Sequence, residues 1–390
     1  MTSRATRATA LVSDVRQARD VVNQLLGYLD QCAGSDLFLT AGEPPRFKIQ
    51  GQVRPAKDIP ELTFDDMTFF LDAIMADRVR VEFDSTYEAN FGYRLPSSAT
   101  RFRVNAYRQR QAPALVFRRV NPIIYTLADL GLPPVLGELA LRKRGLVLFV
   151  GGTGTGKTTS LAALIDHRNR HTSGHILTIE DPIEFEHRSR ECLVTQREVG
   201  VDTLNWDEAL KNALRQAPDV ILMGEIRDAC GMEHCLAYAD TGHLVLATLH
   251  ANNATQALER IVNFFDHAKH EQIRRDLSAN MQAIISQRLV RRIDSTTSRV
   301  AAIEILINSP AIADSILKAD IARVKELVRR SSSQGMQTFD QHLLALYAEK
   351  VISREEVLAQ ADSRGEVTAR MKATERVDDA ALAHLHLQDI

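Results

Sequence analysis

Apolar residues after position 145 occur in short continuous runs that alternate with helix-like stretches. The runs are Leu146–Val150, Ile176–Ile179, Val220–Met223 and Leu244–Leu249. Runs of this length between helical segments are typical of βαβ units, in which a parallel sheet is buried on both faces. The pattern therefore predicts an α/β domain with a parallel-type central sheet.

The part of the chain before this domain has a mixed pattern. Helices are expected at Val21–Leu29 and Thr63–Val81, and strands at Asp36–Thr40, Phe47–Val53 and Arg101–Tyr107. The last of these strands alternates strictly, so its apolar side chains share one face and its two arginines the other. We predict a smaller α+β domain here.

Changes in pattern divide the chain into segments. We expect an N-terminal extension over 1–20, the α+β domain over 21–120 and a linker with a leading helix over 121–144. The α/β core follows over 145–310, then a helical subdomain over 311–365 and a tail over 366–390. Asn121 and Pro122 mark the first domain boundary, because this pair favours a turn.

Composition and charge are those of an ordinary globular protein, with 45% hydrophobic residues, 25% charged residues and a net charge of -2. This balance disfavours a general nucleic-acid or membrane coat, although it says nothing against a local basic patch. No stretch approaches the roughly 20 apolar residues that span a bilayer, and the N-terminus lacks the apolar core of a signal peptide. The four cysteines show no disulfide framework, so we expect a soluble, reduced, cytoplasmic protein.

Three residues of metal-binding type lie close together in the sequence: Cys230, His234 and Cys235. A fourth ligand is missing and the segment has the pattern of a helix. We therefore predict no metal site from these three residues.

The most specific motif is G-x-x-x-x-G-K-[ST], which follows the first apolar run. It comprises Gly151, Gly152, Thr153, Gly154, Thr155, Gly156, Lys157 and Thr158, with Thr159 opening the next helix. Glycines let backbone N–H groups curl around phosphate oxygens, and the N-terminus of the following helix adds positive potential. Lys157 can reach the β- and γ-phosphates, and Thr158 can bind Mg²⁺. The motif predicts binding of ATP with Mg²⁺.

Polar residues end three of the other predicted strands. They are Glu180 with Asp181, Glu225, and His250. Because ligand chemistry gathers at the carboxyl ends of parallel strands, we expect them beside the phosphates and interpret the chain as an ATPase. We interpret Glu180 as polarising the attacking water, Glu225 as organising Mg²⁺ through water, and His250 as sensing the γ-phosphate. The two glutamates could exchange roles.

These motifs stand in the order found in the secretion ATPase superfamily of GspE and PilT type. The glycine-rich loop resembles its Walker A motif, and the segments 179–184, 219–228 and 241–250 resemble its Asp-box, Walker B and His-box. The resemblance implies a RecA-like P-loop domain preceded by a PAS-like domain, and closure into a homo-hexamer. It also matches Glu180 to the family's catalytic base, Glu225 to its Walker B glutamate and His250 to its His-box histidine.

In this family the PAS-like domain supplies arginines to the nucleotide within the ring. Arg103 and Arg118 match those positions by local pattern. The alternatives are a solvated strand face or, because six arginines lie between positions 101 and 119, a nucleic-acid patch. Only Phe102, Tyr107 and Phe117 interleave with these arginines, so no nucleic acid is expected as a partner.

Within the superfamily the chain resembles the pilus-retraction branch, the PilT/PilU family, and lacks the tetracysteine insert of many assembly ATPases. Segments 196–200, 215–219, 251–254 and 335–340 look particularly like the PilU group. The stretch 311–318 keeps only the hydrophobic outline of a C-terminal motif of PilT proteins, which counts against retraction by this chain alone.

The sequence therefore predicts an ATP-hydrolysing hexameric motor of the type IV pilus machinery that supports retraction and twitching motility. The resemblance implies a place at the inner-membrane base of that machine, with a platform protein and a PilT-type retraction ATPase as partners. Two alternatives stay open. One is a nucleotide-binding accessory scaffold of a PilT-type motor with little turnover, and the other is a DNA-translocating RecA-like motor.

Overall fold

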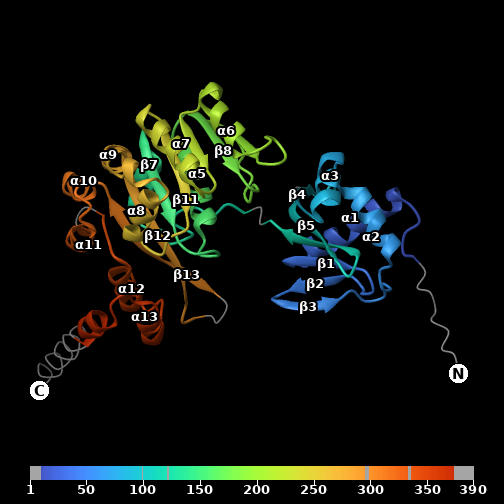
Figure 1. Cartoon of the computed structure of the whole chain (residues 1–390). Helices are drawn as coiled ribbons and strands as arrows, with labels where there is room; N and C mark the ends of the chain where they lie inside the picture. The colour runs from blue at the N-terminus through green and yellow to red at the C-terminus, as the bar shows by residue number, and fades with distance from the viewer. Residues whose placement is uncertain (1–9, 99, 121–122, 295–297, 333–334, 373–390) are drawn as a thin grey trace, which may run out of the picture. The chain divides into compact units, whose positions relative to one another are not determined.

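The computed structural model describes residues 10–98, 100–120, 123–294, 298–332 and 335–372 of the chain (Figure 1). The chain divides into two compact units. The first runs to Ile123 and also includes Pro182–Glu186, and the second comprises Ile124–Asp181 and the residues from His187 onward. Parts of the expected extension, linker and tail (1–9, 121–122 and 373–390) lie outside the described residues.

The first unit is an α+β domain built on an antiparallel sheet, with the strand order β3-β2-β1-β6-β5-β4 among the described residues. The strands are β1 (Asp36–Thr40), β2 (Arg46–Ile49), β3 (Gln52–Pro55), β4 (Glu88–Arg94), β5 (Arg101–Gln109) and β6 (Ala112–Arg119). The helices are α1 (Val15–Gln31), α2 (Phe64–Ile74) and α3 (Asp77–Thr86). As the alternation of β5 predicted, its apolar residues Phe102, Val104 and Ala106 are buried in one core with α1 and α2.

Two predicted elements of this unit are divided in the structure. The strand expected over Phe47–Val53 is the hairpin β2–β3, because Gln50 and Gly51 form a tight turn with φ of 50° and 79°. The helix expected over Thr63–Val81 ends at Ile74, and two residues of extended backbone separate α2 from α3. The apolar stripe that predicted one long helix belongs to α2 alone.

The second unit is built on a seven-stranded sheet with the order β13-β12-β7-β11-β10-β8-β9 among the described residues. The strands are β7 (Gly145–Val150), β8 (Gly174–Glu180), β9 (Cys192–Glu198), β10 (Val220–Met223), β11 (Leu244–Leu249), β12 (Met281–Arg291) and β13 (Arg299–Ile307). Neighbouring strands are parallel except β12 and β13, which are antiparallel. The predicted parallel-type sheet is confirmed, with β9, β12 and β13 as additional strands.

Helices cover both faces of this sheet (Figure 1). They are α4 (Val135–Ala140), α5 (Lys157–His171), α6 (Trp206–Ala213), α7 (Ala229–Asp240), α8 (Ala254–Asn263) and α9 (His270–Asn280). Leu146 and Leu148 of β7 lie in the core beneath α6 to α9, and Val147 and Phe149 lie in the core beneath α4 and α5. Since successive residues of a strand point to opposite faces, this division explains why the run is apolar throughout.

Further helices follow the sheet, as the sequence predicted for the region after position 311, and residues 364–372 are also helical. The labelled helices are α10 (Pro310–Leu317), α11 (Ile321–Arg330), α12 (Phe339–Ala348) and α13 (Arg354–Gln360). The first two join the core beneath α6 to α9, whereas α12 and α13 form a smaller core with Val290 and Ala302 of the sheet.

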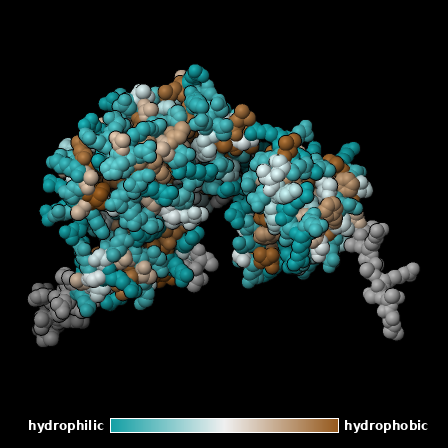
Figure 2. All heavy atoms as spheres, viewed as in Figure 1, coloured by the Kyte–Doolittle hydropathy of each residue, from teal (hydrophilic) through white to brown (hydrophobic). Residues whose placement is uncertain are grey.

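Hydrophilic residues cover most of the surface that is visible in Figure 2, and apolar residues are scattered between them. Among the described residues, no helix combines the length and the apolar character that crossing a membrane requires.

Candidate functional site

The loop between β7 and α5 has a backbone that two of its glycines make possible. Gly151 has φ of 157°, and a Cβ there would lie 2.6 Å from the backbone oxygen of Gln287. Gly156 has φ of 87° and caps α5 in the left-handed conformation. The loop therefore turns tightly and leads directly into a helix N-terminus, which is the arrangement that binds phosphate.

The other predicted loop residues are distributed along this turn. Gly152, Thr153 and Gly154 are exposed at its tip, and Thr155, Thr158 and Thr159 are half-buried. The buried side chain of Lys157 folds back over the loop, where its Nζ donates to the backbone oxygens of Gly151 at 2.9 Å and Gly152 at 2.8 Å. The positive charge of Lys157 therefore lies against the first two residues of the loop.

Gln287 on β12 braces the loop from beneath, and sequence reasoning missed it. Its Nε2 donates to the backbone oxygen of Thr155 at 2.8 Å, and its Oε1 accepts from the Ser160 hydroxyl at 2.8 Å. Gln287 is 2% exposed and Ser160 is 1% exposed. One amide therefore ties the loop to the first turn of α5. No local pattern could have revealed this contact, because Gln287 and Ser160 are 127 positions apart.

The strand register brings the predicted polar residues to one edge of the sheet. Leu249 pairs with Val150, so His250 follows β11 beside the start of the loop. Met223 of β10 pairs with strands on both sides, namely with Ala247 of β11 and with Ile179 of β8. Glu180, Glu225, His250 and the loop therefore share the carboxyl-terminal edge, as the sequence predicted.

Glu225 lies at the centre of a polar cluster on this edge. Its Oε1 is 3.0 Å from Nε2 of His250, and its Oε2 accepts from Nε of Arg227 at 2.9 Å. Arg227 also reaches Oδ2 of Asp181 from Nη1 at 3.4 Å. The hydrogen bond to Glu225 is the largest cause of the raised pKa of Arg227. Arg227 is a second residue that sequence reasoning left without a role.

Glu180 is the last residue of β8 and is 6% exposed. Its Oε1 accepts from the Thr178 hydroxyl at 2.6 Å and from Nε2 of Gln196 on β9 at 3.1 Å. The carboxylate is therefore oriented by two neutral donors. A buried carboxylate in such surroundings is suited to accept a proton from a positioned water.

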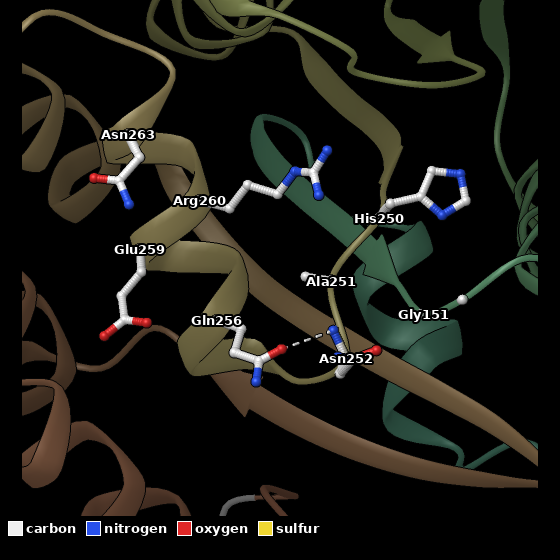
Figure 3. A pocket seen from close by; sticks show the side chains of 9 residues that line it. Gly151, His250, Ala251, Asn252, Gln256, Glu259, Arg260 and Asn263 are labelled. Atoms are coloured by element: carbon white, nitrogen blue, oxygen red, sulfur yellow. Dashed lines mark hydrogen bonds between the residues drawn. The ribbon is translucent and has the colours of Figure 1, made fainter.

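A cavity of about 550 Å³ opens beside the loop (Figure 3). It is lined by Gly151 and Gly152, by His250 and by one side of α8. In Figure 3 the guanidinium group of Arg260 extends from α8 toward the wall formed by His250. The cavity size falls in the range of small-ligand sites, which is roughly 300–1,000 Å³. Arg260 is thus a further cation next to the loop that the sequence did not single out.

The start of α8 is fixed to the sheet by a buried carboxylate. Oε2 of Glu304 on β13 accepts from the backbone N–H of Ala254 at 2.8 Å and from the Ser286 hydroxyl at 2.7 Å. Burial raises the pKa of Glu304, while these two hydrogen bonds act in the opposite direction. The start of α8, which forms one wall of the cavity, is therefore anchored to β13.

Arg103 and Arg118 belong to the first unit, where β5 and β6 place them directly opposite each other. Directly opposed residues share a face of the sheet, and like charges there repel. Each arginine has an acidic partner: Nη1 of Arg103 is 2.9 Å from Oε1 of Glu184, and Nε of Arg118 is 2.8 Å from Oδ1 of Asp36. Arg118 keeps 66% of its side chain exposed. Both therefore remain ion-paired side chains within reach of solvent.

Two of the three aromatic residues considered for a nucleic-acid patch do not share this face. Phe102 and Phe117 are 0% exposed, so they cannot stack on bases. Tyr107 is half-buried. The arginine face of β5 and β6 thus lacks two of the three aromatic platforms that the sequence suggested.

The sequence model of the type II/IV secretion system protein family matches residues 23–383. The chain belongs to this family. It is 48% identical to the type IV pilus ATPase PilU of Pseudomonas aeruginosa over 362 residues, covering 93% of this chain and 94% of PilU. It is 42% identical to the PilT retraction ATPase of the same organism over 334 residues, covering 86% of this chain and 96% of PilT.

A solved structure of the pilus retraction motor PilT with bound ADP has the same architecture. It superimposes with a TM-score of 0.82 at 38% identity, covering 88% of this chain and 98% of that one. Family membership and this fold confirm the predicted PilT/PilU resemblance, the RecA-like P-loop ATPase and its binding of nucleotide. The requirement for Mg²⁺ and the roles of individual residues stay predictions.

Proposed function

We propose that the chain is a hexameric ATP-driven motor of the type IV pilus machinery that supports pilus retraction and twitching motility. The observation that carries the proposal is the convergence of Glu180, Glu225 and His250 on the sheet edge that bears the P-loop. The similarity to PilU and PilT along nearly the whole chain supports the assignment to pili.

In the proposed site the triphosphate of ATP lies along the loop from Gly151 to Lys157. The Nζ of Lys157 exchanges the backbone oxygens of Gly151 and Gly152 for oxygens of the β- and γ-phosphates. The Thr158 hydroxyl and the Glu225 carboxylate, the latter through water, fit Mg²⁺ because this ion prefers hard oxygen ligands and retains several waters. Bound Mg²⁺ supplies charge neutralisation on the phosphate oxygens.

We assign the general base to Glu180. Thr178 and Gln196 orient this buried carboxylate at the end of β8, which suits a group that accepts a proton from a positioned water. Glu225 instead lies between Arg227 and His250, which suits a carboxylate that orders metal-bound water. His250 contacts Glu225 and borders the cavity. It would therefore sense a bound γ-phosphate and transmit its presence to Glu225 at the same edge of the sheet.

The assignment of Glu180 is tested by Glu180→Gln, which keeps the shape and removes the base. Mg-ATP binding, measured by titration calorimetry, should stay near that of the wild type, while turnover falls by roughly 10²–10⁴-fold. The matched control is Glu191→Gln, an exposed glutamate just before β9, which should keep the wild-type rate. If Glu225→Gln shows the predicted behaviour and Glu180→Gln instead weakens Mg-ATP binding, the two glutamates have exchanged roles.

We further propose that Arg103 and Arg118 act on the nucleotide of a neighbouring copy in the ring. Their carboxylate partners Glu184 and Asp36 keep them ordered before assembly. The Arg103–Glu184 pair is exposed on both sides, so Arg103 can exchange partners at little free-energy expense, whereas Arg118 leaves a buried carboxylate when it turns to a nucleotide. An arginine delivered to the phosphates can raise turnover by roughly 10³–10⁵-fold.

A mixing experiment tests this contribution between subunits. Arg103→Ala and Lys157→Ala proteins are each expected to be nearly inactive as pure rings. In rings formed from equal amounts of the two proteins, the intact P-loop of an Arg103→Ala subunit faces the intact arginine of a Lys157→Ala subunit at about a quarter of the interfaces. Turnover should therefore reappear on mixing. Wild-type turnover by pure Arg103→Ala rings would contradict the proposal, and so would a mixture that assembles but stays inactive.

The cellular part of the proposal places the motor in the cytoplasm at the inner-membrane base of the pilus machine, beside a platform protein and a PilT-type ATPase. A strain lacking this chain should lose twitching motility and regain it with the wild-type gene. Complementation by the Glu180→Gln gene separates the motor from an accessory scaffold: the motor predicts no recovery, whereas full recovery would show that turnover is dispensable. Turnover of the purified chain, measured with and without the PilT-type partner, shows whether the motor works alone.

A further inference from the structure

Three side chains of metal-binding type meet on the surface formed by α6 and α7. They are Asp207 in the first turn of α6 and Cys230 with His234, one helical turn apart on α7. A carboxylate oxygen, a thiol sulfur and an imidazole nitrogen lie within 4.8 Å of one another. The sulfur is already 3.3 Å from Oδ1 of Asp207, while Lys211 holds the other carboxylate oxygen at 3.1 Å.

This group differs from the one that the sequence suggested. Cys235 is buried on the other side of α7, where its sulfur lies 3.4 Å from the sulfur of Met223. The ligand that replaces it, Asp207, comes from another helix, 23 positions before Cys230. The sequence argument against a site built from Cys230, His234 and Cys235 therefore holds, but it does not apply to this group.

The hydrogen bonding of His234 prepares one of its ring nitrogens for a cation. The Tyr238 hydroxyl gives its only proton to the backbone oxygen of Leu210, so it faces Nδ1 of His234, 3.3 Å away, with a lone pair. Nδ1 must then carry the imidazole hydrogen, which leaves Nε2 as the basic nitrogen. Metal-bound histidines are typically oriented in this way, by a partner that accepts the second N–H.

The dimensions and exposure of the group also suit a metal ion. Tetrahedral Zn²⁺ with ligands at about 2.0–2.3 Å separates them by about 3.3–3.8 Å, so the present spacing needs a contraction of about 1 Å. Asp207 and Cys230 are exposed and His234 is half-buried, so an ion can enter.

We propose that Asp207, Cys230 and His234 bind a transition-metal cation of the Zn²⁺ type, with the fourth coordination position open to water or an outside ligand. Thiolate and imidazole select such ions over Mg²⁺. The site is separate from the ATP site, but the two are close. A small cavity of about 70 Å³ is lined by Asp207 and Cys230 as well as by Glu225 and Arg227 of the Walker B segment.

The test uses Co²⁺ as a spectroscopic probe on the metal-free full-length protein, with Mg²⁺ in large excess. The expected result is one Co²⁺ per chain with the near-ultraviolet absorption of a cobalt–thiolate bond, which Zn²⁺ then abolishes by displacement. Cys230→Ser should lose this band, and Asp207→Asn should bind Co²⁺ at least about tenfold more weakly. The matched controls, Cys32→Ser and Glu208→Gln, should behave like the wild type.

A positioning role for Tyr238 gives an independent readout. Tyr238→Phe removes the acceptor of the His234 N–H without touching a ligand, and should weaken Co²⁺ binding by about tenfold while the thiolate band remains. Absence of the band in the wild type, or its persistence in Cys230→Ser, would overturn the proposal. Because Cys230 is exposed, loss of the band in that variant cannot be attributed to a disrupted core.

Coupling to the motor is a second consequence, and it rests on the proposed function. Zn²⁺ should lower ATP turnover of the wild type more than that of Cys230→Ser, because the bound ion shares a cavity wall with Glu225. Equal inhibition of both proteins would refute the coupling, whereas the cobalt spectra decide metal binding whether or not the chain hydrolyses ATP.

Discussion

Gln287, which supports the P-loop through hydrogen bonds to Thr155 and Ser160, offers a quantitative test of how the fold prepares the nucleotide site. Gln287→Met keeps the size of the side chain and removes both of its hydrogen bonds. The Ser160 hydroxyl, 1% exposed, then loses its acceptor, and the half-buried backbone oxygen of Thr155 loses a donor. Leaving a buried polar group unpaired costs about 1–3 kcal/mol, so we expect a loss of about 2–4 kcal/mol in the free energy of unfolding.

A double-mutant cycle isolates the contact between the two side chains. Ser160→Ala alone leaves Oε1 of Gln287 without a donor, whereas Ser160→Ala with Gln287→Met removes both partners together. The double variant should therefore be more stable than the sum of the single losses predicts, by about 1–2 kcal/mol. Urea unfolding followed by Trp206 fluorescence measures this term in the second unit, since Trp206 is the single tryptophan of the chain.

The same proteins show whether the brace serves the site as well as the fold. The KM for ATP should rise in Gln287→Met under conditions where the protein remains folded, because the loop backbone is released. The matched control is Gln282→Met, a half-buried glutamine of the same strand, for which a change within about 0.5 kcal/mol is expected. Additive losses within about 0.5 kcal/mol would refute the reasoning, because they would mean that Gln287 and Ser160 act independently.

Four further predictions concern burial and backbone geometry. Burial lowers the pKa of His187 to about 4, so as pH falls from 6.5 toward 4 the unfolded chain binds a proton before the folded chain does, and the protein loses stability. In His187→Gln the free energy of unfolding should therefore change less over this pH range, by up to about 3 kcal/mol. The raised pKa of Glu304 has the opposite sign, since its stabilising contribution is complete below the unfolded pKa and is lost as pH rises through the folded pKa. The stability of Glu304→Gln relative to the wild type should therefore increase from acid to neutral pH in the same urea titrations. Gly151→Ala should reduce turnover more than tenfold, which corresponds to about 1.4 kcal/mol in the activation free energy, because the added Cβ would clash with a backbone oxygen. Gly27 lies inside α1 with open space around it, so Gly27→Ala should raise the melting temperature through about 1 kcal/mol of helix propensity.

The sequence revealed the parts of the fold that depend on local pattern. The apolar runs of β7, β8, β10 and β11 could be recognised because both of their faces are buried, so no polar position interrupts them. The P-loop and the polar strand ends followed from the same pattern, since the topology of parallel strands brings their carboxyl ends together. These local features are sufficient to indicate an ATPase.

Features that depend on contacts between distant positions could not be predicted in this way. β12 was missed because buried polar residues such as Ser286 and Gln287 interrupt its apolar pattern, although both have partners in the fold. The partner of Arg103, Glu184, is 81 positions away and became visible only with the first unit assembled. The helix break before Asp77 was hidden because α2 and α3 together keep a plausible helical composition.

The central claim is that this P-loop hydrolyses ATP, and the most direct measurement is steady-state turnover of the assembled Lys157→Ala protein beside the wild type. Lys143→Ala serves as the matched control, because Lys143 is an exposed lysine before β7 and outside the loop. The account predicts that Lys157→Ala falls to the background rate of phosphate release while Lys143→Ala keeps the wild-type rate. Unchanged turnover in the Lys157→Ala protein would contradict it.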